Sequence, residues 1–436
     1  MGDPRQFELQ LDHPIMKNHL FFLFTSTIFV GSVSAQGLYQ ASNKALEEVP
    51  LPFKWNAGIN AIYDDNVSSG NSQDPGLKVS ALSYNPYVGL SVVQSSGQTT
   101  WNVSGMLGVI YYPDAPSVGG TPIDDLSNQS NLSASLQHKL NEQLTLSTYN
   151  MISREREPDY SYGVASSHAG KGEYVSMSTD NSASYRWTKR LATVTGFRLG
   201  ATQYPQSDSK DNDRNTYQLS NQFRFQLGEQ SVLTSSYRFG ESFSQGNGAD
   251  IADHFLTIGG EYRFTPTVIG IAQAGAQFHE TTTGTASQDA STTNPYFESS
   301  VNAKMNKQFN VKSFLRYSAE SDSLNQNNIV FAEHRLLRWG ITNEWMISPK
   351  MSVINGLDYM PSTFMGGVNK NDGLASADLS ETLVSSYVTL KMKFSDFMTG
   401  SLSYTYVNNV SDLNDAIGRT QTYNRSRISL GLNVNF

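Results

Sequence analysis

The last ten residues of the chain, 427–436, are the feature that most limits what it can fold into. Hydrophobic side chains stand at every second position of this segment, and polar residues or glycine fill the positions between them. The hydrophobic set is Ile428, Leu430, Leu432, Val434 and Phe436. Soluble chains usually end in residues that fray, whereas the closing strand of a membrane barrel stays paired because lipid tolerates no open sheet edge. The ending therefore predicts the last strand of an outer-membrane β-barrel.

The N-terminal region predicts export. Met16 opens a short basic segment, an apolar run extends from Leu20 to Val30, and small residues stand at Val33 and Ala35. This is the pattern of a signal peptide, and the run is shorter than the roughly 20 apolar residues that a spanning helix needs. Because acids and prolines crowd residues 1–15, we interpret Met16 as the true start. We expect residues 1–35 to be a signal peptide cleaved after export through the Sec pathway, and residues 36–52 to be a short periplasmic tail.

Composition narrows the class of protein. The chain has 436 residues and no cysteine, which excludes disulfides and thiolate metal sites. Its mean hydropathy of −0.40 resembles that of a soluble protein, but a membrane barrel has such a value because only alternate residues face lipid. The 22 Tyr, 22 Phe and 5 Trp suit aromatic girdles at the two membrane surfaces. A formal charge of −8 lacks the basic signature of nucleic-acid binding, so we expect no nucleic-acid partner.

Serial hairpins fill the rest of the chain. In residues 217–227, for example, hydrophobic and polar side chains alternate with a period of two, which excludes a helix. Short turns such as 140–142 alternate with longer polar loops such as 64–78, an asymmetry typical of outer-membrane barrels. We expect strands to begin near Phe53, Val79, Thr99, Leu126, Leu144, Glu173, Leu191, Arg214, Ser231, Ile251, Thr267, Asn294, Phe309, Phe331, Met351, Leu379, Phe397 and Gln421.

The predicted fold class is therefore all-β. Residues 53–436 should form a transmembrane antiparallel up-and-down barrel of about 18 strands (16–18). An even number of strands returns both termini to the periplasm. A soluble β-sandwich also alternates, but its strands are typically about 5–6 residues long, shorter than those expected here.

A resemblance to a known family supports this interpretation. The segment 55–63 leading into Tyr63-Asp64-Asp65-Asn66-Val67, together with the serial hairpins, resembles the beta-barrel porin type 2 family of outer-membrane proteins. The ending also looks like the signal that the barrel assembly machinery reads, with Gly431, Val434 and terminal Phe436 as its matching positions. Leu430 stands where that signal is often polar. The resemblance implies a large outer-membrane barrel and leaves the substrate open.

Barrel size predicts a channel. A barrel of 16–18 strands leaves an aqueous lumen unless something plugs it, and residues 36–52 are too few for a plug. Loops 154–172 and 362–378 are the longest candidates for an inward-folding loop. We therefore expect a porin-like channel for passive diffusion of small polar solutes. Two alternatives stay open: a channel for exopolysaccharide export or assembly, and a surface adhesin or structural barrel that works through its loops.

Strand parity identifies the residues expected to line the lumen. Basic side chains outnumber acidic ones at these positions, which predicts a mild anion preference. The alternative is that they are solvated wall residues or local ion pairs, such as Glu261 with Arg263, each of little energetic value. The selectivity candidates are Arg186, Arg224, Arg238, Glu261, Arg263, Lys312, Arg316, Arg338, Glu344, Glu381, Lys391 and Arg427. Tyr87 and Tyr387 share this parity, without forming a continuous aromatic row.

Nothing in the sequence indicates an enzyme. The histidines beyond residue 35 lie outside any GxSxG or HExxH setting. Asp208, Asp211 and Asp213 crowd one loop but lack the glycine and glutamate of a calcium-binding EF-hand. We expect no cofactor and no metal site. The expected partners are outer-membrane lipid and lipopolysaccharide, the barrel assembly machinery and small polar solutes, and a homo-oligomer would be compatible with this fold.

Overall fold

The computed structural model describes the barrel region with gaps in its connections. The described residues are 53–67, 78–118, 121–122, 124–156, 173–205, 213–244, 250–282, 289–320, 325–326, 329–369, 374–412 and 422–436. The predicted signal peptide (1–35) and tail (36–52) lie outside them. Within these ranges no helix is long and apolar enough to span a membrane.

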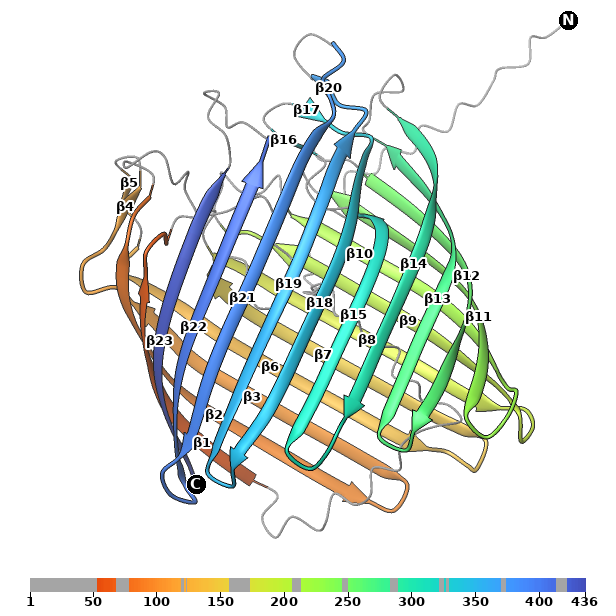
Figure 1. The fold of residues 1–436 in the computed structure, drawn as a ribbon, viewed down its shortest axis with the longest axis horizontal. Coiled ribbons are helices and arrows are strands. Elements are labelled where there is room, and N and C mark those ends of the chain that lie inside the picture. The colour runs from red at the N-terminus through yellow and green to blue at the C-terminus, as the bar shows by residue number, and fades with distance from the viewer. Residues whose placement is uncertain are drawn as a thin grey trace, which may run out of the picture.

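Eighteen strands build one closed antiparallel sheet (Figure 1). In chain order they are β1 (Phe53–Asp64), β2 (Ala81–Ser96), β3 (Thr99–Tyr111), β6 (Leu126–Lys139), β7 (Leu144–Arg156), β8 (Glu173–Arg186), β9 (Leu191–Gln203), β10 (Arg214–Gln226), β11 (Ser231–Ser244), β12 (Asp250–Thr265), β13 (Val268–Thr282), β14 (Ala290–Lys304), β15 (Phe309–Glu320), β18 (Glu333–Ser348), β19 (Met351–Met365), β21 (Leu379–Lys393), β22 (Met398–Ser411) and β23 (Tyr423–Asn435).

Each strand pairs with the next one along the chain, and the last pairs with the first. The closing register between β1 and β23 runs from Asn56 opposite Asn435 to Asp64 opposite Arg427. The backbone of Phe436 extends this ladder, because its N–H donates to Trp55 O at 2.7 Å and its carbonyl accepts from Trp55 N at 3.2 Å. The predicted eighteen-stranded up-and-down barrel, with a closing strand at the C-terminus, is confirmed.

Most predicted strand starts match the structure, and the differences have local causes. The largest occurs in β14, which begins at Ala290 rather than near Asn294 because its pairing with β13 continues to Thr281. The strand expected near Phe331 begins at Glu333 instead. Phe331 is fully buried in the preceding connection.

The two ends of the barrel differ. Tight turns such as 97–98, where Gly97 has a φ of 53°, join strands at one end, here called the turn end. The longer connections lie at the other, the loop end. Two small sheets belong to these longer connections (Figure 1). They are formed by β4 (Ser117–Val118) with β5 (Thr121–Pro122), and by β16 (Asn325–Gln326), β17 (Ile329–Val330) and β20 (Val368–Asn369).

The wall has an apolar outer face and a polar inner face. On β1, Trp55 and Tyr63 are 56% and 47% exposed, whereas Asp64, with the opposite parity, is buried. Asn85 on β2 donates to Gln129 on β6 at 2.5 Å, across the intervening β3. Side chains two strands apart can meet in this way only on the concave side of a curved sheet. The polar face therefore lines the interior.

Candidate functional site: the inner face of the barrel

The residues predicted to line the lumen all have inner-face parity. Arg224, for example, lies between the exposed Phe223 and Phe225 on β10, and Arg263 lies between the exposed Tyr262 and Phe264 on β12. The structure places the same parity at Arg186, Arg238, Glu261, Lys312, Arg316, Arg338, Glu344, Glu381, Lys391 and Arg427. Their role in selectivity stays a prediction.

Arg224 and Glu261 form a buried ion pair. The Nη2 atom of Arg224 lies 2.6 Å from Oε2 of Glu261, and the two side chains are only 3% and 2% exposed. They come from β10 and β12, with β11 between them. Arg224 also donates from Nη1 to Oε1 of Gln222 at 3.0 Å. Glu261 is thus paired with a cation from another strand, rather than with Arg263 in its own.

Arg238 is held by aromatic rings further along the wall. Its guanidinium carbon lies 3.9 Å from the centroid of Phe255 and 5.3 Å from that of Tyr296. Both distances are within the range of cation–π attraction. The hydroxyl of Tyr296 donates to Glu298 at 2.5 Å, and Gln273 donates to the same carboxylate oxygen at 3.1 Å. This cluster joins β11 to β14 and orients Arg238.

Two arginines stand side by side between two carboxylates. Arg316 on β15 is in register opposite Arg338 on β18. Glu298 is in register opposite Arg316 on the other side, and Asp358 on β19 lies 3.7 Å from Arg338. The guanidinium of Arg338 also lies 4.8 Å from the ring centroid of Phe314. Acidic and basic side chains therefore follow one another across this part of the wall, and Arg338 is paired with Asp358.

Two acids of the inner face were not predicted from the sequence. Asp253 on β12 and Asp358 on β19 were absent from the candidates, although both share the inner-face parity of their strands. The neighbouring Tyr359 is 39% exposed on the outer face. The alternation of residues 351–365 therefore contained the signal for Asp358.

Uncompensated basic residues lie near the turn end. Arg186, Lys312 and Lys391 are exposed, and none of the described carboxylates forms an ion pair with them. Lys393 differs, because its Nζ lies 2.8 Å from Oδ1 of Asp396 in the turn 394–397. The hydrogen bond from Lys393, and then its charge, lower the pKa of the Asp396 carboxyl. Asp396 therefore stays ionised at neutral pH and compensates Lys393.

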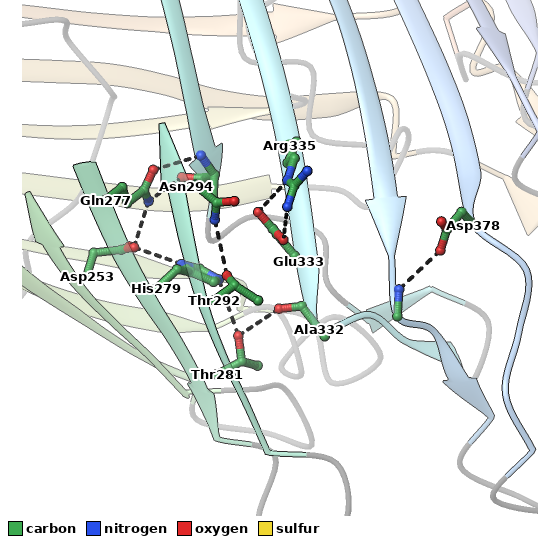
Figure 2. A network of polar contacts seen from close by, with 12 residues as sticks. Asp253, Gln277, His279, Thr281, Thr292, Asn294, Ala332, Glu333, Arg335 and Asp378 are labelled. Atoms are coloured by element: carbon green, nitrogen blue, oxygen red, sulfur yellow. Dashed lines mark hydrogen bonds and ion pairs between the residues drawn. The ribbon is translucent and has the colours of Figure 1, made fainter. Parts of the chain in front are cut away.

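A polar network lines the loop end of the lumen (Figure 2). The Nε2 atom of Gln277 donates to Asp253 at 2.7 Å and to the carbonyl of Ala319 at 2.8 Å. The Oε1 atom of Gln277 accepts from Ala319 N at 2.8 Å. This side chain therefore satisfies the backbone N–H and carbonyl of Ala319 at the end of β15, beyond Tyr317, where the pairing of β15 with β14 ends.

The same network binds a connecting segment. His279, whose side chain is fully buried, lies 2.7 Å from Asp253 through Nδ1 and 3.2 Å from Thr281 through Nε2. Thr281 donates to the carbonyl of Ala332 at 3.0 Å (Figure 2). The segment 329–332 is thereby attached to the inner wall.

An apolar cluster completes this attachment. Phe331 and Phe364 are both fully buried, with ring centroids 5.3 Å apart, and they pack with Ile251. The segment 329–332 is therefore held against the inner wall at the loop end by both polar and apolar contacts. Of the two predicted inward loops, residues 157–172 of the first lie outside the described part, and the second contributes β20 to the small sheet.

The Tyr63-Asp64-Asp65-Asn66 motif closes the barrel. Asp64 accepts from Nε and Nη2 of Arg425 on β23, with contacts of 2.9 and 2.6 Å, and lies 3.2 Å from Nε of Arg427. The side chains of Arg425 and Asp64 are 1% and 6% exposed. Arg427, a predicted selectivity residue, therefore shares a carboxylate at the seam.

The next two residues of the motif continue the contact. Asp65 accepts from the backbone N–H of Ser426 at 2.5 Å and lies 3.4 Å from Lys78. Asn66 donates from Nδ2 to the carbonyl of Asn424 at 2.9 Å. Asp64, Asp65 and Asn66 thus join the first strand to the last and continue their contact up to the loop end of the barrel.

The predicted assembly signal lies at the other end of the same seam. Phe436 is 75% exposed. Val434 has outer parity on β23, and Gly431 has inner parity. A Cβ atom at Gly431 would lie 2.5 Å from both Asn60 Oδ1 and Ser401 Oγ, so a larger residue there would force these two side chains to move. Recognition by the assembly machinery stays a prediction.

Among the described residues no group of three or more histidines, aspartates and glutamates is arranged to hold a metal ion.

Comparison with known proteins gives distant structural likenesses. No protein-family model and no curated protein matches the chain, so the resemblance to the beta-barrel porin type 2 family stays a prediction. OpdK of Pseudomonas aeruginosa, solved with vanillate, is 10% identical with a TM-score of 0.47, covering 88% of this chain and 99% of that one. OccAB3 of Acinetobacter baumannii is 9% identical with a TM-score of 0.46 at the same coverage.

A siderophore receptor shows a weaker structural likeness. The siderophore receptor PirA of Pseudomonas aeruginosa is 9% identical with a TM-score of 0.40, covering 88% of this chain and 80% of that one. Likenesses this remote carry no information about what passes through this barrel.

Proposed function

We propose that this protein is an outer-membrane channel for passive diffusion of small polar solutes. One observation supports it above all: an eighteen-stranded closed wall with an apolar outer face and a polar, charged inner face. A barrel of 16–18 strands is wide enough for an aqueous lumen. Exposed inner-face side chains such as Lys312 and Lys391 are consistent with a lumen filled by water.

The proposed orientation in the membrane follows from the difference between the turn end and the loop end of the barrel. The turn end faces the periplasm and the loop end faces outward, as is usual for bacterial barrels. Residues 1–35 serve as the cleaved signal peptide, and the ending at Phe436 is read by the barrel assembly machinery. Lipid surrounds the apolar outer face, and lipopolysaccharide contacts the part of that face nearest the loop end. The protein works as a conduit and not as an enzyme.

The proposed selectivity is a mild preference for anions. In the middle of the wall, arginines are matched by carboxylates, as in Arg224 with Glu261 and Arg338 with Asp358. Near the turn end Arg186, Lys312 and Lys391 have no such partner among the described carboxylates. Unpaired charge on a lumen wall attracts the opposite ion, so these basic residues should set the sign of the preference.

Single-channel recording in planar bilayers tests both parts. Folded protein should give discrete conductance steps, graded polyethylene glycols should report the lumen radius, and a salt gradient should give a reversal potential of anion-selective sign. The double variant Lys312→Glu with Lys391→Glu should shift that potential toward cations. Lys189→Glu with Lys307→Glu, in the turns 187–190 and 305–308, is the matched control with the same change of charge and should shift it less. Absence of conductance would refute the channel, and cation selectivity of the unmodified protein would refute the anion preference.

A further inference from the structure

The outer face of β7–β10 contains a group of polar side chains within the apolar belt. They are all asparagines and threonines, and we call them the amide patch: Thr148, Asn150, Thr179, Asn181, Thr195 and Asn221. Their outer parity follows from exposed hydrophobic neighbours in the same phase, such as Leu146 on β7 and Phe197 on β9.

The patch is contiguous across four strands. Thr148 stands opposite Asn181, and Asn150 stands opposite Thr179, which makes a square of four polar residues on β7 and β8. Thr195 stands opposite Asn221 on β9 and β10. Asn181 faces Phe197 on β9, and Thr195 faces Ala183 on β8, so the pair adjoins the square diagonally, where Asn181 and Thr195 are neighbours.

The patch lies at mid-height rather than at a membrane surface. Along β7, Leu146 precedes it and Ile152 follows it in the same phase. Along β10, Leu219 and Phe223 flank Asn221 and are 48% and 56% exposed. Polar headgroups at either rim are therefore separated from the amide patch by apolar rows.

A purely apolar stretch of the outer face shows what lipid contact alone requires. On β23, Ile428, Leu430 and Leu432 are 49%, 62% and 41% exposed, without a polar side chain between them in that phase. Two other outer asparagine pairs are Asn343 opposite Asn355 on β18 and β19, and Asn408 opposite Asn424 at the loop end of β22 and β23. Several strands separate both pairs from the amide patch in either direction around the barrel.

Hydrogen bonds inside the patch leave much of its polar capacity unused. Asn150 donates to Thr148 at 3.3 Å, and Asn181 donates to Thr179 at 3.0 Å. Asn221 donates to Thr195 at 2.9 Å. An asparagine amide has two N–H donors and an oxygen with two acceptor positions, so each amide keeps further groups that make no other hydrogen bond within the described residues. Hydrocarbon cannot satisfy these groups.

We propose that the amide patch is the contact surface of a two-fold symmetric dimer of this chain. Each amide and hydroxyl both donates and accepts hydrogen bonds, so the patch complements a rotated copy of itself. A two-fold contact uses the same surface on both subunits. The patch contains no charged residue, which disfavours a charged partner, and acyl chains offer no hydrogen bond. The proposal rests on the membrane placement proposed above.

The absence of cysteine gives a direct test. The single variants Asn150→Cys and Asn181→Cys, expressed in the full chain and oxidised within native outer membranes, can form disulfides only between copies or with another protein. At least one should give a covalent homodimer in at least tenfold greater yield than Leu430→Cys, the control on the apolar wall of β23. Equal yields at all three sites, or products that contain a different protein, would overturn the proposal.

A second set of variants measures the contact without cross-linking. Replacing Asn150, Asn181 and Asn221 together by leucine suits a lipid-facing wall, so the barrel should still fold and show heat-modifiable mobility. The mass of the detergent-extracted protein should fall from dimer to monomer. The control, Asn343→Leu with Asn355→Leu, should stay dimeric. A monomeric unmodified protein, or a leucine variant that stays dimeric, would overturn the proposal.

Conductance recorded on the same samples separates this inference from the proposed function. A monomeric protein that still conducts refutes the dimer and leaves the channel standing. A dimer that never conducts refutes the channel and leaves the dimer standing.

Discussion

The buried contact at the barrel seam makes a strong quantitative prediction. Replacing Asp64 by asparagine keeps the size of the side chain but removes the carboxylate that Arg425 and Arg427 share. The side chain of Arg425 is only 1% exposed, so water cannot take the place of the lost anion. Arg425 and Arg427 would then both lose the negative charge that they share.

The expected loss of stability follows from this burial. Removing one partner of a buried ion pair typically costs about 3–5 kcal/mol, which corresponds to roughly a hundredfold to several-thousandfold change in the unfolding equilibrium. Arg425→Gln should cost less, because Asp64 keeps Arg427 at 3.2 Å. The order of the two losses therefore tests the geometry independently of their absolute size.

Urea unfolding in phospholipid vesicles measures these losses, with tryptophan fluorescence as the signal. Trp55 stands on β1 next to the seam, so it reports directly on strand separation. Asp396→Asn is the control, because it removes the same kind of carboxylate from an exposed pair at the turn end. The reasoning is wrong if Asp64→Asn is no more harmful than this control, or if Arg425→Gln proves the more harmful of the two seam variants.

Two further changes test other parts of the wall. Replacing Phe436 by aspartate should impair assembly far more than conductance, because a charged side chain would replace the terminal aromatic of the predicted assembly signal while the backbone pairing with Trp55 stays possible. Normal heat-modifiable mobility in the outer-membrane fraction would contradict this. Replacing Gly356 by alanine should cost about 1–3 kcal/mol, because a Cβ atom there would lie 2.4 Å from Cε1 of Tyr387. The same substitution should be nearly neutral in a Tyr387→Ala background, and an undiminished loss by urea unfolding would show that the ring does not cause it.

Local patterns in the sequence were enough to predict the strands and their faces. Alternation is a property of each strand by itself, since neighbouring side chains point to opposite sides of a sheet. For that reason residues 217–227 could be assigned correctly without knowledge of their neighbours. The strand count and the inner parity of Arg224 and Arg316 followed from the same rule. Phe331 was wrongly predicted to begin a strand, because the sequence alone does not distinguish a buried aromatic residue in a connection from one at the start of a strand.

Contacts between distant strands could not be read in this way. Arg224 meets Glu261 across β11, and Asp64 meets Arg425 after a separation of 361 residues. Both contacts depend on the curvature, stagger and closure of the whole sheet. The sequence contained each charge but not its partner.

The amide patch shows the same difference between what one strand reveals and what only the assembled sheet reveals. Each of its asparagines has outer parity in its own strand, and alone each would be an isolated polar residue on a lipid-facing wall. The register of β7–β10 places them together. The sequence by itself therefore determined the barrel, its strand number and the face of each residue, because these depend on a repeat of two residues along the chain. Tertiary structure alone decided which charges are neutralised, which connecting segment packs on the inner wall and where polar groups gather on the outer wall, because register and closure act between strands and not within them.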